Sequence, residues 1–177
     1  MSRDEPSRNG RWIASVVDRF EQPLVRYALH ITGDLDAARD VVQETFLRLV
    51  RDQQRPESSV PVQVGPWLFR VCRNAALDQR KKESSMRAAI DLVESDVQAP
   101  EPNHVDVLER RESAAQVVDL LADLPANQQE VIRLRFEHGL SYREISEVTS
   151  LTVTNVGYLL HTAIQTLRKT LQPEAGV

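Results

Sequence analysis

Residues 140–167, LSYREISEVTSLTVTNVGYLLHTAIQTL, contain two helical patterns separated by a short turn. The first begins with a capping box, Ser141 with Glu144 three residues later, and should end near Thr149. Thr152 can cap the second, longer helix. We expect its buried face to consist of Val153, Val156, Leu160, Ala163 or Ile164, and Leu167. This arrangement is the helix-turn-helix pattern, which favours DNA binding but also fits any helical hairpin.

The rest of the sequence also has helical periodicity, and no segment alternates as a strand would. The N-terminal helices that we expect cover residues 13–31, 35–49 and 67–82. Pro23 should kink or divide the first, Asp34 can cap the second, and Pro66 suits the first turn of the third. Further on, an apolar stripe spans residues 114–124, and Pro125 opens a helix that Gly139 closes. The predicted fold class is therefore all-α.

The charge distribution divides the chain into three parts. The net charges are +2 over residues 11–83 (12 Lys+Arg, 10 Asp+Glu), −4 over 84–112 (3 against 7) and −1 over 113–171 (5 against 6). Pro100 and Pro102 interrupt any helix in the acidic part. We therefore expect two small helical domains joined by a flexible acidic linker, with boundaries at residues 11–83, 84–111 and 112–172.

Composition excludes several classes of protein. The 177 residues are 41% hydrophobic and 27% charged, which is a globular balance. No apolar run approaches the roughly 18–20 residues of a membrane span, and the polar N-terminus does not resemble a secretory signal. One cysteine, Cys72, forms neither an internal disulfide nor a thiolate metal site. We expect a cytoplasmic protein without membrane insertion. Its overall charge of −4 argues against nucleic-acid binding when taken alone.

Enzyme signatures are missing from the sequence. It has no Gly-rich phosphate loop, no Gly-x-Ser-x-Gly and no His-Glu-x-x-His. The four histidines are scattered without metal-ligand spacing. We therefore expect no catalytic residues, no metal and no cofactor.

The third expected helix carries a basic face. Its members are Arg70, Arg73, Asn74, Leu77 and Lys81, with Arg80 and Lys82 beside them. Cations at this spacing can follow a phosphate backbone, and an asparagine among them can bind a base edge. Trp67 and Phe69 lie at the start of the helix, where an aromatic ring can stack on an unpaired base. The alternative is a solvated charged face with cations at a helix C-terminus.

The second expected helix presents a mixed face to solvent. It contains Asp40, Gln43, Glu44, Leu47 and Arg51. An apolar Leu47 among acidic residues can mark a protein-docking surface. From the spacing alone, an ordinary solvated face that happens to include one leucine is the better fit.

Three segments together resemble the bacterial sigma-70 family. Residues 34–50, DLDAARDVVQETFLRLV, resemble its helix that binds core polymerase. Residues 66–82, PWLFRVCRNAALDQRKK, are similar to its helix that engages the minus-ten element. Residues 124–146, LPANQQEVIRLRFEHGLSYREIS, resemble the start of its minus-thirty-five-binding domain. The short chain without a middle domain resembles the extracytoplasmic-function (ECF) subgroup.

The resemblance implies an alternative sigma factor, which binds core RNA polymerase, directs it to promoter DNA and helps melt that DNA. In such factors the first domain clamps onto a coiled coil of the largest polymerase subunits and captures unstacked bases. An anti-sigma factor is a further candidate partner. The core-binding residues implied are Asp40, Gln43, Glu44 and Leu47. Those implied for the minus-ten element are Trp67, Arg70, Arg73, Asn74 and Lys81. The segment from Asp52 to Gly65, with the helix after it, would hold the captured base.

The recognition helix departs from the family pattern, because residues 153–167 contain no Lys or Arg. The residues expected to face the minus-thirty-five element are Thr154, Asn155, Tyr158, Leu159 and Thr162, with Arg143 of the preceding helix on a phosphate. Asparagine can pair with adenine, and threonine or leucine can contact a thymine methyl. Alternatively, Tyr158 and Leu159 form a protein-binding patch.

Two other functions fit the pattern. One is a stand-alone helix-turn-helix regulator with an N-terminal helical interaction domain. The other is a protein-binding decoy that keeps the sigma shape without reading DNA. The acidic linker is likewise either a plain tether or a segment that occupies a basic channel of the polymerase.

Overall fold

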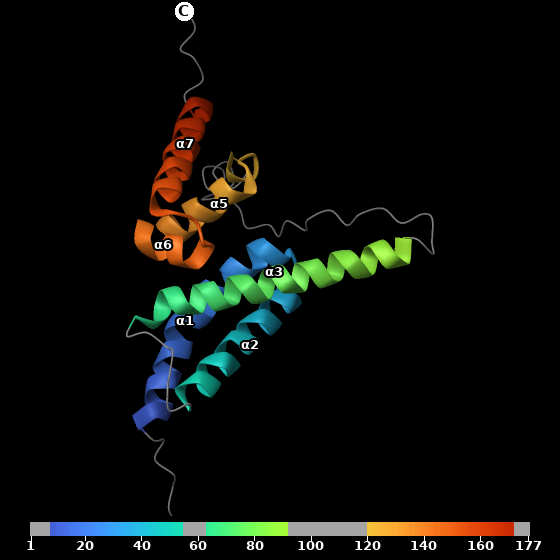
Figure 1. The fold of residues 1–177 in the computed structure, drawn as a ribbon, viewed down its shortest axis with the longest axis vertical. Coiled ribbons are helices and arrows are strands. Elements are labelled where there is room, and N and C mark those ends of the chain that lie inside the picture. Colours follow the sequence, from blue (N-terminus) through green and yellow to red (C-terminus); the bar gives the residue numbers. More distant parts are fainter. Residues whose placement is uncertain (1–7, 55–62, 92–119, 172–177) are drawn as a thin grey trace, which may run out of the picture. The chain divides into compact units, whose positions relative to one another are not determined.

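The computed structural model describes residues 8–54, 63–91 and 120–171, and the regular structure in these ranges is entirely helical (Figure 1). The chain divides into two compact units, Met1–Pro100 and Glu101–Val177. Within the same ranges, no helix has the length and apolarity that crossing a membrane requires. The predicted all-α fold with two helical units is confirmed.

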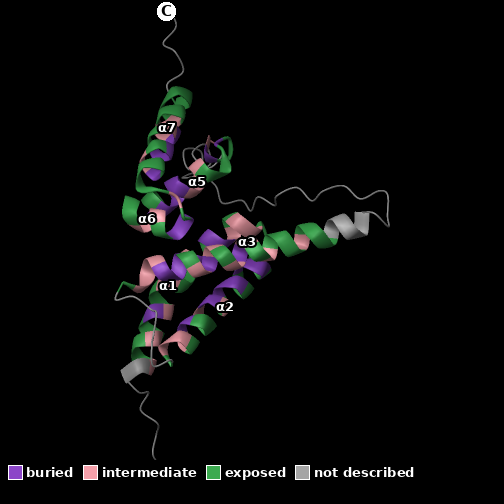
Figure 2. Ribbon diagram, viewed as in Figure 1, coloured by how far each residue is buried: buried purple, intermediate pink, exposed green. Residues whose placement is uncertain are grey.

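Unit 1 is a bundle of three helices, each of which packs on the other two. They are α1 (Arg8–Thr32), α2 (Leu35–Gln53) and α3 (Val64–Asp91). Their buried faces meet in one core, which is purple in Figure 2. The fully buried residues of that core include Leu24, Ala28, Ala38, Leu49, Leu68, Cys72 and Ala76. The helical periodicity predicted much of the inward faces of α1 and α2, including Val16, Leu24 and Ala28 on α1 and Val41 and Leu49 on α2.

The connection between α1 and α2 follows the predicted turn chemistry. Gly33 has a φ of 75°, a left-handed conformation that favours glycine, and its N–H donates to the Leu29 carbonyl at 2.8 Å. The Asp34 carboxylate accepts a 2.7 Å hydrogen bond from the Ala37 N–H, so the predicted cap is confirmed. Pro23 does not divide α1, because the helix continues through it with the adjacent Leu24 fully buried in the core.

Helix α3 is longer than predicted. Pro66 lies in its first turn, as expected, but the helix continues past Lys82 to Asp91. Residues 83–91, ESSMRAAID, contain no proline or glycine that would stop it. The first part of the predicted linker, residues 84–91, is therefore helical, whereas residues 92–111 lie outside the described part of the chain.

Unit 2 contains the helix-turn-helix. Its elements are α5 (Ala126–Ile132), the π-helical turn η1 (Arg133–Glu137), α6 (Tyr142–Thr149) and α7 (Val153–Leu171). Helix α7 packs on both α5 and α6. The core residues are Val131, Leu134, Ile145, Val148, Val156, Leu160 and Ala163. Leu121 and Leu124 of the predicted stripe are buried, while its first part, residues 114–119, lies outside the described residues.

The ends of α6 and the start of α7 confirm the predicted caps. The Ser141 hydroxyl accepts from the Glu144 N–H at 3.3 Å, and the Glu144 carboxylate accepts from the Ser141 N–H at 2.7 Å. Ser150 forms the turn with a φ of 61°, a conformation that non-glycine residues seldom adopt. The Thr152 hydroxyl then accepts from the Asn155 N–H at 3.2 Å.

The helix opened by Pro125 ends just before Gly139, as predicted, but its last turn is not α-helical. It finishes in the π-helical turn η1, where the His138 N–H donates to the Arg133 carbonyl at 3.2 Å, and Gly139 follows with a φ of 70°. Arg133 is buried and donates to the Glu137 carboxylate at 2.8 Å. Apolar periodicity encodes neither the π-helical turn nor the buried guanidinium.

Candidate functional site

A groove of about 580 Å³ runs between α1 and α2. Three of the four residues predicted to bind core polymerase line it: Asp40, Gln43 and Leu47. Leu47 is 45% exposed, although its neighbours in the groove include Phe46 and Val50. The groove thus combines an apolar surface with two acidic residues, amide groups and one cation, Arg39, which suits a protein partner with both apolar and charged side chains.

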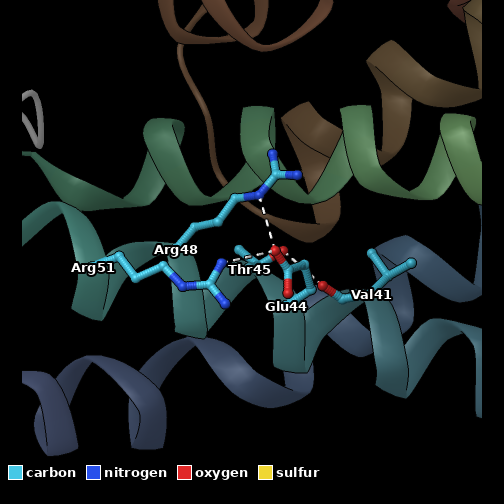
Figure 3. Close-up of polar contacts among 5 residues, drawn as sticks. All are labelled: Val41, Glu44, Thr45, Arg48 and Arg51. Carbon is cyan, nitrogen blue, oxygen red and sulfur yellow. Dashed lines mark hydrogen bonds and ion pairs between the residues drawn. The ribbon is translucent and has the colours of Figure 1, made fainter.

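Glu44, the fourth predicted residue, does not line the groove. Its Oε1 atom accepts from Arg48 Nε at 3.3 Å and from Arg51 Nη1 at 3.4 Å (Figure 3). Next to it, the Thr45 hydroxyl donates to the Val41 carbonyl at 2.8 Å and is fully buried. Glu44 therefore lies at the boundary between core and solvent, in surface ion pairs that a charged partner can replace at low cost.

The wall of the groove that α1 supplies was not recognised in the sequence. It includes Ile13, Val17, Gln22 and Val25. Helical periodicity places Ile13 and Val17 on the main apolar face of α1, but both are only half-buried and line the groove. Val25, an apolar residue outside the main α1 stripe, was the signal for a second apolar surface.

The exposed face of α3 carries most of the residues predicted for the minus-ten element. Arg70, Asn74 and Lys81 are exposed, and Arg73 is half-buried. Spacings of four and seven residues place the three exposed side chains along one side of the helix. The geometry therefore presents a continuous polar and basic strip to solvent.

The two aromatic residues at the start of α3 belong to the core. Trp67 is 5% exposed and Phe69 is 2% exposed. The Phe69 ring packs edge-on against Tyr27 of α1, with centroids 5.3 Å apart and planes inclined by 70°. Base stacking by Trp67 would require its ring to leave the core, so burial argues against that predicted role. The position of Trp67 and Phe69 near a helix start was therefore not enough to predict whether they are buried or exposed.

Cys72 belongs to α3, and its side chain lies in the same core, near Leu24 of α1 and Thr45 of α2. Burial raises the pKa of its thiol to about 12, while a hydrogen bond with Thr45 acts in the opposite direction. Its sulfur lies 4.0 Å from the Leu24 carbonyl oxygen. Cys72 is therefore a protonated core residue at neutral pH, as expected from its place in the helical pattern.

In α7, three of the predicted DNA-facing residues are exposed: Thr154, Asn155 and Tyr158. Thr162 is half-buried, and its hydroxyl donates to the Tyr158 carbonyl at 2.9 Å. Arg143 of α6 is exposed and pairs with Glu147 at 3.6 Å. The exposed face of α7 thus offers amide, hydroxyl and phenol groups, with its cations, Arg168 and Lys169, confined to the last turn.

Two residues of α7 lie opposite to their predicted sides. Leu159 was expected to face solvent but is 6% exposed, and Val153 was expected in the core but is 47% exposed. Val153 is the first residue of α7, whereas Leu159 falls where α7 packs against α5 and α6. The alternative patch formed by Tyr158 and Leu159 consequently loses its leucine.

Comparison with known proteins assigns the family. The family models for sigma-70 region 2 and sigma-70 region 4 match residues 16–86 and 114–167. The ECF RNA polymerase sigma factor SigL of Mycobacterium tuberculosis is 32% identical over 92% of this chain and 90% of the relative. The chain belongs to the ECF sigma factors of the sigma-70 family. It is an alternative sigma factor, which directs RNA polymerase to promoters.

A further relative and two solved structures are also similar to this sigma factor. The ECF sigma factor SigM of Bacillus subtilis is 29% identical, over 88% of this chain and 93% of the relative. A solved structure of RpoE from Bartonella quintana, bound to the anti-sigma factor NepR, has a TM-score of 0.66 at 21% identity and covers 93% of this chain and 99% of that one. CnrH bound to the cytosolic domain of CnrY has a TM-score of 0.62 at 23% identity, covering 96% and 94%. These two structures share the fold.

Proposed function

We propose that this sigma factor divides initiation among three surfaces. The α1–α2 groove binds core polymerase, the exposed face of α3 binds the unpaired minus-ten strand, and the exposed face of α7 binds the minus-thirty-five element. The observation that carries the proposal is the convergence of Asp40, Gln43 and Leu47 on one groove. These three residues were predicted from the exposed face of one helix, and they form one wall of a partly apolar groove.

The occupant that we infer for the groove is a helical coiled coil of the polymerase. A helix can insert apolar side chains between Leu47 and Val25, while basic side chains meet Asp40. Glu44 extends the acidic surface beyond the groove once Arg48 and Arg51 move to acceptors on the partner. Charge complementarity of this kind directs the two proteins into register.

Promoter recognition is shared between the two units. On α3, Arg70 and Arg73 neutralise phosphates while Asn74 contacts a base edge. On α7, Asn155 contacts adenine and Tyr158 or Thr154 packs against the bases, while Arg143 holds a phosphate. Because α7 supplies few cations of its own, core polymerase provides much of the attraction for DNA.

The same proposal covers the absence of catalysis, the location of the protein and one further partner. The protein acts without catalytic chemistry of its own, since its surfaces bind and position rather than react. It works in the cytoplasm, where core polymerase meets promoters. An anti-sigma factor is a further partner, in line with the bound partners of the structural neighbours RpoE and CnrH.

Promoter-specific run-off transcription with core polymerase tests this function. The full-length protein should enable core to start at one position on its promoter, and core alone should not. Co-purification without DNA is the accompanying measurement, because a stand-alone regulator would leave core unbound. Core binding without any specific transcript would instead identify a decoy and contradict the proposal.

A further inference from the structure

The first turn of α3 is held against α1 by one close contact. A Cβ atom added to Gly65 would lie 3.2 Å from two carbons of the Phe20 ring. The ring therefore lies directly on the backbone of α3, in a space that a larger residue at position 65 would need. This contact fixes Phe20 beside the point where the chain enters α3.

Arg19 is stacked on the same ring. Its guanidinium carbon lies 5.2 Å from the centroid of Phe20, within the range of a cation–π interaction. Arg19 is exposed, and its side chain forms no ion pair with the residues in the three described ranges. The guanidinium is thus oriented by Phe20 while its N–H donors remain available.

The position of Arg19 on α1 directs it away from the polymerase groove. Successive residues of a helix are about 100° apart, so Arg19 and Glu21 lie on opposite sides of Phe20. Glu21 lines the α1–α2 groove. Arg19 therefore lies on the other flank of α1, where Phe20 meets the start of α3.

The α3 strip lies on the other side of α3 from the Phe20 contact, because Arg70 and Asn74 are about 140° and 180° around the helix from Gly65, so a strand on the strip reaches Arg19 around the N-terminal end of α3. Arg70, its first exposed cation, is five residues after Gly65, or about 7.5 Å along the helix axis. We propose that Arg19, stacked on Phe20 at the start of α3, binds a phosphate of the unpaired promoter strand where that strand passes the N-terminal end of α3. A guanidinium suits this task because it can stack on an aromatic face and donate to phosphate at once.

This inference rests on the proposed role of α3 and adds a residue from a different helix to that site. Arg19 is a phosphate contact that does not select among bases, so its effect should be similar at every promoter. Phe20 acts as a positioning residue, because it sets the orientation of the guanidinium without touching DNA.

The test uses holoenzyme assembled from core polymerase and the full-length protein, with promoter DNA whose non-template minus-ten segment is single-stranded. Arg19→Gln should weaken binding about 5-fold at low salt and reduce the slope of log affinity against log salt by about 0.7. Arg19→Lys should recover the salt slope but only part of the affinity, since the stack is lost. Phe20→Leu should lower affinity without changing the slope, because the charge remains.

The matched control is Arg11→Gln, which removes the same charge from an exposed position of α1. Arg11 lies about 12 Å from Arg19 along the helix axis and does not line the groove, although Ile13, two residues further on, does. It should leave both affinity and slope unchanged, and each variant should bind core as the wild type does.

Arg70→Gln separates this inference from the function on which it rests. If Arg70→Gln weakens binding and Arg19→Gln does not, the Arg19 contact is refuted and the α3 site stands. If neither substitution changes binding, both proposals are overturned. An equal loss with Arg11→Gln would also overturn the contact, because general charge would then explain the effect.

Discussion

Replacement of Leu47 by aspartate should abolish most of the affinity for core polymerase. Leu47 is 45% exposed on the wall of the α1–α2 groove. Fully burying a leucine stabilises by about 1.5–3 kcal/mol, so covering the exposed share is worth about 0.7–1.3 kcal/mol on binding. Leu47→Ala, which removes most of that gain, should therefore weaken binding about 3- to 10-fold.

Leu47→Asp adds a second penalty. A carboxylate enclosed at the interface without a partner costs a further 2 kcal/mol or more, so the total loss should reach at least about 100-fold. The free protein should be much less affected, within about 1 kcal/mol in unfolding free energy, because the side chain is half-exposed. Titration of labelled full-length protein with core polymerase, without DNA, measures the affinity, and thermal unfolding measures the stability.

Met86→Asp is the control for this experiment. Met86 is 64% exposed on α3 and does not line the groove, so the same chemical change there should leave core affinity intact. Binding of Leu47→Asp within 3-fold of wild type would refute the assignment of the groove to core polymerase. An equal loss in Met86→Asp would show that added negative charge, not the groove, determines affinity.

Three further outcomes are expected. Asn155→Ala should change which upstream element holoenzyme enriches from random DNA; an unchanged element would refute direct reading by α7. Cys72 should resist alkylation at pH 8 until the protein is denatured. Because its folded pKa of about 12 exceeds the ordinary thiol pKa of 9.0, its contribution to stability is complete below pH 9 and is lost as pH rises toward 12, which pH-dependent denaturant titration would detect. Ser150→Gly should raise the unfolding free energy by up to about 1 kcal/mol by relieving its left-handed φ, and a lower melting temperature would contradict this reasoning.

Local chemistry made much of the fold predictable. Asp34, Ser141 and Thr152 cap their helices through atoms within three residues of themselves, so the sequence alone contains each interaction. Most of the buried faces of α1 and α2 followed from apolar periodicity, which is also a property of neighbouring residues in one helix. The family resemblance then related these helices to polymerase and promoter binding.

What the sequence did not predict depends on contacts between helices. The α1 wall of the groove exists because Val25 and Val17 face α2, which periodicity within α1 cannot show. Trp67 was assigned to DNA because an aromatic residue at a helix start fits both stacking and burial, and only packing between helices decides for burial, as it does for Phe69 against Tyr27. Leu159 was misplaced for a related reason, because α7 meets two helices and buries a wider face than one stripe.

The absence of cations from Val153 to Leu167 affects how molecules of this protein are distributed inside a cell. Non-specific affinity for chromosomal DNA grows with the number of phosphates that a surface neutralises. A recognition helix with cations only in its last turn therefore adds little to adsorption of free molecules along the genome. The unbound pool stays in solution, where rival sigma factors compete for the same core enzyme. Promoter output should then follow the concentration of this factor and its affinity for core, with little buffering by bulk DNA.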